Sequence, residues 1–190
     1  MKPVLIGYFP KRAVRRGDRL PSDAPSPFPL AEIDEIASVS GCIAHEPQRW
    51  TEQLTPNEFW GFADPPSAWE AVFPEDRPGL VLFAYKLFPA RFVDGRQEPL
   101  EMPELAIEPL PDSFLRLGWD AVEIRGHVHG YHFGCSPLSC NHQANLPHAA
   151  PINRHCLAES EEQGIALARR FSISKPEPGP YCAVEVWREA

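Results

Sequence analysis

The stretch G-L-V-L-F-A-Y-K-L-F, residues 79–88, is apolar at both alternating sets of positions, with Lys86 as its single charge. A strand with two apolar faces is typical of the centre of a sheet that is covered on both sides. Asp94-Gly95 follows it and is a signal for a tight hairpin turn, so we expect residues 91–93 to pair with 97–100. We therefore predict a sheet built around residues 79–88.

Strand and helix patterns are interspersed irregularly along the rest of the chain. Apolar and alternating runs predict further strands at 3–9, 38–44, 104–108, 119–124 and 181–187. Helical spacing, capping residues and a closing glycine predict helices at 30–37, 64–73, 112–117 and 160–172. The sequence thus predicts one α+β domain over 1–190. We expect a mixed or mainly antiparallel sheet, three to four short helices and long Pro-rich loops.

The composition and charge of the chain restrict the classes of partner that it can bind. The chain has 190 residues, 23 prolines and a formal net charge of -8. An acidic surface repels phosphate, so we expect no nucleic acid and no membrane as partner, but another protein or a small molecule. Residues 1–19 are basic by contrast, with Lys2, Lys11, Arg12, Arg15, Arg16 and Arg19. We expect these side chains to pair with the acidic body, with binding of an anion as the alternative.

Cysteine usage and the N-terminus predict a location. No apolar run approaches the roughly 20 residues that span a bilayer. The first ten residues also lack the apolar stretch and cleavage site of a signal peptide. Five cysteines, an odd number, fit thiols or metal ligands better than a disulfide framework. We therefore expect a cytoplasmic protein.

Residues 127–156 hold six of the seven histidines and three of the five cysteines. Cys-x4-Cys spacing lies at the wide end of zinc-binding pairs, and neighbouring imidazoles offer further ligands. The best tetrahedral set is Cys135, Cys140, His142 and Cys156. Zinc is thus the one cofactor that the sequence suggests. The alternative is that the thiols are small buried hydrophobes and the histidines line a loop.

The same stretch contains a second set of candidate polar residues, which are His127, His129, His132, Asn141, Asn153, Arg154 and His155. A histidine beside Cys135 or Cys140 would activate a thiolate, so a zinc-dependent or thiol-dependent hydrolase is one alternative function. The glycine-rich, nucleophile-elbow and zincin motifs of common enzymes do not occur. We also expect Asn141, Asn153 and Arg154 to hold residues 133–156 by side-chain hydrogen bonds.

Several short strings resemble known groups. F-G-C-S-P-L-S-C-N (133–141), N-R-H-C-L (153–157) and E-P-G-P-Y with E-V-W-R (177–188) resemble a set of bacterial hypothetical proteins. That resemblance implies no activity, cofactor or partner. L-G-W-D (117–120) resembles small acidic immunity proteins that neutralise toxins. Ser38-x-Ser40 is similar to the S-T-S strand of ADP-ribosyltransferases, which makes such a fold a further alternative.

The function that these observations favour is a non-catalytic binding or interaction module. The acidic balance, the modest size and the lack of a catalytic motif fit it. A structural zinc in the His/Cys stretch is compatible with this interpretation, since it would pin a long loop.

Overall fold

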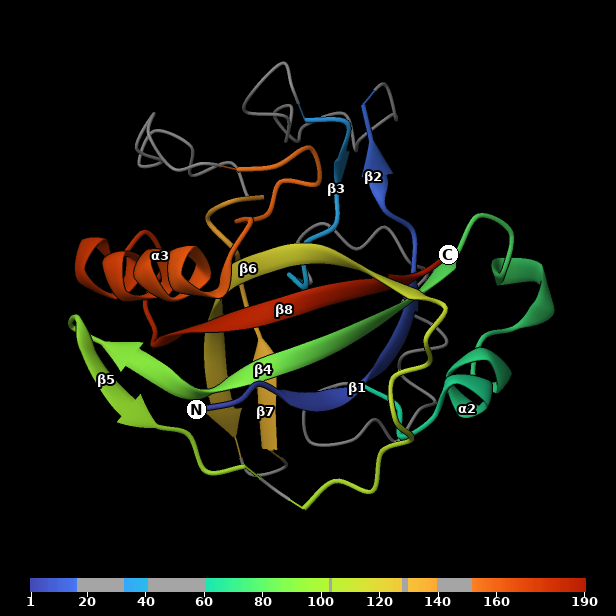
Figure 1. The fold of residues 1–190 in the computed structure, drawn as a ribbon, viewed down its shortest axis with the longest axis horizontal. Coiled ribbons are helices and arrows are strands. Elements are labelled where there is room, and N and C mark those ends of the chain that lie inside the picture. The colour runs from blue at the N-terminus through green and yellow to red at the C-terminus, as the bar shows by residue number, and fades with distance from the viewer. Residues whose placement is uncertain (17–32, 41–60, 103, 128–129, 140–151) are drawn as a thin grey trace.

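A computed structural model describes residues 1–16, 33–40, 61–102, 104–127, 130–139 and 152–190 of the chain. The described residues are 42% strand and 17% helix, so sheet dominates the fold. Six antiparallel strands form the main sheet in the order β1-β4-β8-β6-β7, with β5 added to the end of β4 (Figure 1). Their bounds are β1 Val4–Lys11, β4 Val81–Val93, β5 Arg96–Pro99, β6 Phe114–His127, β7 Gly130–Phe133 and β8 Tyr181–Glu189.

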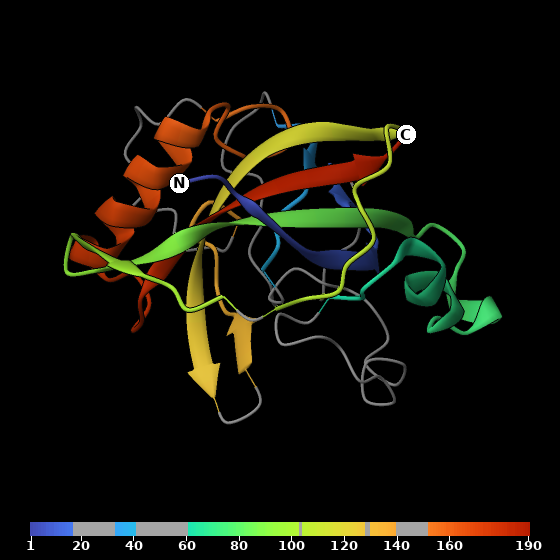
Figure 2. The same ribbon diagram turned by 60° about the horizontal axis from the view of Figure 1, so that its bottom comes forward.

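The sheet curls into a half-barrel. Figure 2 shows β6 bending so that its second half, with β7 beside it, turns away from β4 and β8. Ile6 of β1 and Tyr131 of β7 lie at opposite edges of the sheet, yet both pack into one apolar cluster with Phe83, Val122 and Val184. Residues from the two edge strands can share one cluster only on the concave side of a curled sheet. This cluster therefore fills the inner face of the half-barrel.

Helix α3, Glu161–Ser174, covers the outer face across β4, β6 and β8. Ser160 caps its first turn and Gln163 bonds back to the Ser160 backbone, which completes a capping box. Phe171 packs against Tyr181 with ring centroids 5.8 Å apart. Gly164 lies over Trp119, where an added Cβ would come within 2.7 Å of the Trp119 Cβ. A glycine is therefore needed for α3 to approach the sheet so closely.

Two smaller units flank the sheet. Helix α2, Pro65–Glu70, is capped by Asp64 and leads into a 3-10 turn, η2, at Pro74–Asp76. This unit packs on β1 and β4 around Tyr8, whose pKa is raised to about 12 by burial and by the nearby charges of Glu108 and Asp64. A separate ribbon pairs β2, Val14–Arg15, with β3, Glu35–Ile36.

The expectation of three to four helices is wrong. The described residues form two α-helices, α2 and α3, together with the short turn η2. Of the helix expected at 30–37, residues 30–32 lie outside the described residues, and Glu35–Ile36 form strand β3. The strand forms because the Asp34 and Glu35 amides both donate to the Arg154 carbonyl and Glu35 pairs across to Arg15. Tertiary pairing outweighs the helical spacing of Ile33 and Ile36.

The second helix that does not form is the one expected at 112–117. Phe114 and the residues after it extend β6 along β8, and Gly118 makes a bulge at φ +147 instead of ending a helix. An added Cβ at Gly118 would lie 2.6 Å from the Ala158 carbonyl oxygen. The predicted edge strand at 104–108 is also absent from the residues that the structure describes there.

The strands built on 79–88 were predicted correctly. β4 lies between β1 and β8, and Asp94-Gly95 closes a hairpin in which Val93 pairs with Arg96. Cys182, Val184 and Val186 share the inner face, as the alternation of β8 predicts. Across the described ranges, neither helix is long and apolar enough to cross a membrane.

Candidate functional site at the polar end of the half-barrel

Asp120 is a fully buried carboxylate on the inner face of β6, opposite Val184 of β8. Its Oδ2 accepts hydrogen bonds from Ser38 Oγ at 2.6 Å and from the Val39 amide at 2.9 Å, and its Oδ1 accepts from Ser136 Oγ at 2.5 Å. A buried carboxylate costs much free energy unless it is hydrogen-bonded in this way. Asp120 therefore ties two separate chain segments, 38–39 and 136, to one strand.

Lys11 is a basic side chain that contacts the Ser38 segment of this cluster. Its ammonium donates to the Ser38 carbonyl and lies over the rings of Phe83 and Tyr85, with centroids at 4.7 and 5.6 Å. The side chain is buried, so the aromatic faces and the carbonyl replace water around the charge. Lys11 thus joins the end of β1 to the same segment that Asp120 holds.

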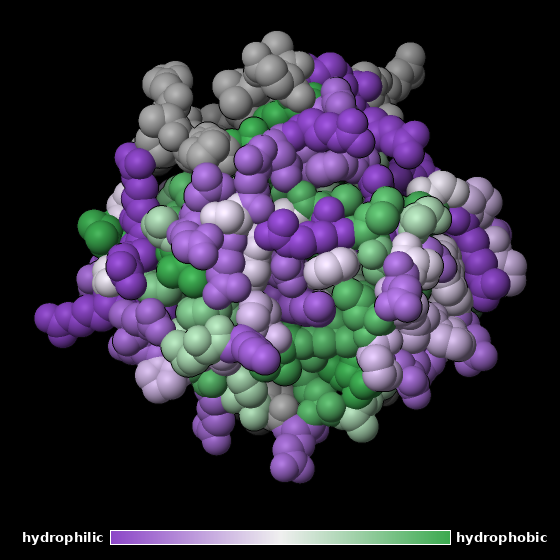
Figure 3. Space-filling model, viewed as in Figure 1, coloured by the Kyte–Doolittle hydropathy of each residue, from purple (hydrophilic) through white to green (hydrophobic). Residues whose placement is uncertain are grey.

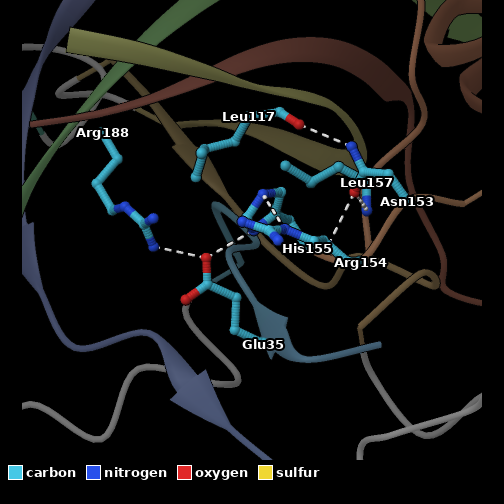
Figure 4. Close-up of polar contacts among 7 residues, drawn as sticks. All are labelled: Glu35, Leu117, Asn153, Arg154, His155, Leu157 and Arg188. Carbon is cyan, nitrogen blue, oxygen red and sulfur yellow. Dashed lines mark hydrogen bonds and ion pairs between the residues drawn. The ribbon is translucent and has the colours of Figure 1, made fainter. Parts of the chain in front are cut away.

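A second polar group centres on Glu35 of β3 (Figure 4). Its Oε1 accepts from His155 Nδ1 at 2.6 Å and from Arg188 at 2.5 Å, and the Glu35 and His155 side chains are only 10% and 13% exposed. Burial alone would raise the pKa of Glu35, but the His155 hydrogen bond and the Arg188 charge hold it below its ordinary value of 4.5. The carboxylate is therefore charged at neutral pH and fastens β3 to β8 and to residue 155.

Asn153 fixes the segment that carries His155. Its amide donates to the Leu117 carbonyl at 2.7 Å, and its Oδ1 accepts from the amides of His155 at 2.9 Å and Leu157 at 3.3 Å. The expectation that Asn153 holds this loop by side-chain bonds is confirmed. Asn141 lies outside the described residues, and the described contact of Arg154 is with the neighbouring His155.

We call the cluster formed by these groups the polar end; it comprises Lys11, Glu35, Ser38, Asp120, Ser136, Asn153, His155 and Arg188. It gathers residues from β1, β3, β6 and β8 and from two loops. Of these residues, only Asn153 and His155 were predicted from the sequence as site candidates, and Lys11 and Ser38 were noted for other reasons. An acid at an inward position of an apolar strand, as Asp120 is, is the one local signal that would have indicated the site.

The structure describes two of the four residues of the predicted zinc set. Cys135 and Cys156 are both buried, and Cys156 Sγ donates to the Leu138 carbonyl at 2.8 Å. Cys140 and His142 lie outside the described residues. Within the described part of the chain, no three His, Cys, Asp or Glu side chains group as a metal site would require. Zinc binding by Cys135, Cys140, His142 and Cys156 stays a prediction.

Three histidine candidates remain, which are His127, His129 and His132. His132 is half-buried on β7, where it pairs across to Arg125 of β6. His127 ends β6 and His129 falls outside the described residues, so their side chains are not placed.

Two features bear on catalysis. A thiol needs a lowered pKa to act as a nucleophile, but burial, helped by the Asp120 charge, raises the pKa of Cys182. An imidazole oriented by a carboxylate can serve as a base. His155 has that orientation, but its Nε2 accepts from Arg154 Nε at 3.4 Å, so both of its ring nitrogens have partners within the protein.

Comparisons with protein-family models, with curated proteins and with solved structures give no match.

Proposed function

We propose that this chain is a non-catalytic binding protein, with another protein or a small molecule as its partner, and that the polar end frames its binding face. One observation carries the proposal. The polar groups described in segments 33–40, 135–139 and 152–158 bond to the protein's own backbone and side chains, so they hold loops in place. Loops fixed by a rigid scaffold are the usual carriers of binding surfaces.

The Arg154 side chain is exposed, while the residues on either side of it are held in place. Asn153 and His155, on either side, are anchored to Leu117 and Glu35. The Arg154 backbone is anchored as well, since its carbonyl accepts from the Asp34 and Glu35 amides. Because the backbone here is already fixed, binding through this side chain orders little further backbone, and arginine is enriched among the residues that dominate binding energy.

The test is affinity capture from cells of the source organism, with mass spectrometry of retained proteins and small molecules. Wild type is compared with Arg154→Glu and with Arg170→Glu, an exposed arginine on α3 at a different face. We expect a component that wild type and Arg170→Glu retain in stoichiometric amount and that Arg154→Glu loses by about tenfold. Retention of no such component, or equal retention by Arg154→Glu, would contradict the proposal.

Two finer expectations belong to this proposal. A cytoplasmic location is supported by Cys135, Cys156 and Cys182, which are not joined in disulfides. A structural zinc on the His/Cys stretch would add to the frame without changing the function. Metal content of protein purified without chelator or added metal tests it, and about one zinc per chain is the supporting result.

A further inference from the structure

We draw no further inference here: the strongest candidate, the hydrophobic surface area over the sheet between α3 and α2 (Figure 3), carries no proposal because nothing in the part of the chain that the structure describes shows what covers it.

Discussion

The outer face under α3 and the polar end on the inner face are stabilised by different physical interactions, although both rest on β6 and β8. Under α3 the contacts are apolar and close, with Phe171 on Tyr181 and Gly164 on Trp119. At the polar end, buried carboxylates on β6 and β3 hold loop segments by hydrogen bonds and ion pairs. Apolar burial is non-directional, whereas a carboxylate fixes particular donors. We therefore expect the two regions to respond differently to substitution and pH.

The largest effect is expected on the apolar side. Phe171→Ala should lower the free energy of unfolding by about 3–5 kcal/mol, because a large side chain that is 1% exposed leaves a cavity. Urea unfolding at neutral pH measures it. Ile173→Ala on the same helix, where the side chain is 63% exposed, is the control and should change stability by less than about 0.5 kcal/mol. Equal losses in both variants would show that α3 is not held by burial of Phe171.

Asp120→Ala is the matching test at the polar end. It leaves Ser38 Oγ, Ser136 Oγ and the Val39 amide without their acceptor, so we expect a loss of about 3 kcal/mol. Asp120→Asn keeps the shape and one acceptor oxygen, and should lose less. Denaturant unfolding of both variants measures the difference. A loss below about 1 kcal/mol for Asp120→Ala would mean that the carboxylate does not brace the loops.

Asn153→Ala is expected to cost about 2 kcal/mol. The Asn153 side chain donates one hydrogen bond to the backbone and accepts two. Its removal leaves the Leu117 carbonyl and the amides of His155 and Leu157 without these partners. Asn153→Asp, which keeps the acceptor oxygen but not the donor, should fall between wild type and Asn153→Ala in thermal unfolding. If both variants are as stable as wild type, Asn153 does not stabilise this loop.

The smallest effect is a pH dependence confined to the polar end. The folded-state pKa of Glu35 is lowered, so its stabilisation is present above about pH 4.5 and is lost as pH falls through the folded-state value. Glu35→Gln should cost about 1–2 kcal/mol at pH 7, and the difference from wild type should shrink below pH 4.5. Urea unfolding from pH 7 to pH 3 measures this. If wild type and Glu35→Gln differ in stability by the same amount from pH 7 to pH 3, the charge of Glu35 does not contribute to stability.

The comparison also explains which parts of the fold could be predicted from sequence. The central strand, the Asp94-Gly95 hairpin and the capping box at Ser160 are signalled by residues close together in the chain, and all three are present. The polar end is not signalled in this way, because Glu35 meets Arg188 across 153 positions and Ser38 meets Asp120 across 82. Non-local hydrogen bonds to the Arg154 carbonyl also hold the segment of Glu35 and Ile36, which form a strand although the spacing of Ile33 and Ile36 predicted a helix.

The histidine and cysteine stretch shows the same limit in the candidate site. Residue type pointed to metal or thiol chemistry, but the position of each side chain decides its role. Cys156 is buried as a donor to Leu138, and His155 is bound to a glutamate that lies far away in sequence. Residue type and spacing alone do not determine such partners.

The central claim is that Asp120 holds the loops of the polar end in place independently of the packing of α3 on the outer face. Hydrogen exchange followed by mass spectrometry on wild type and Asp120→Asn tests this claim most directly. We predict faster amide exchange in residues 33–40 and 135–139, which Asp120 binds, with α3 at Glu161–Ser174 as protected as in wild type. Equal acceleration in α3, or no acceleration in the two segments, would contradict the account.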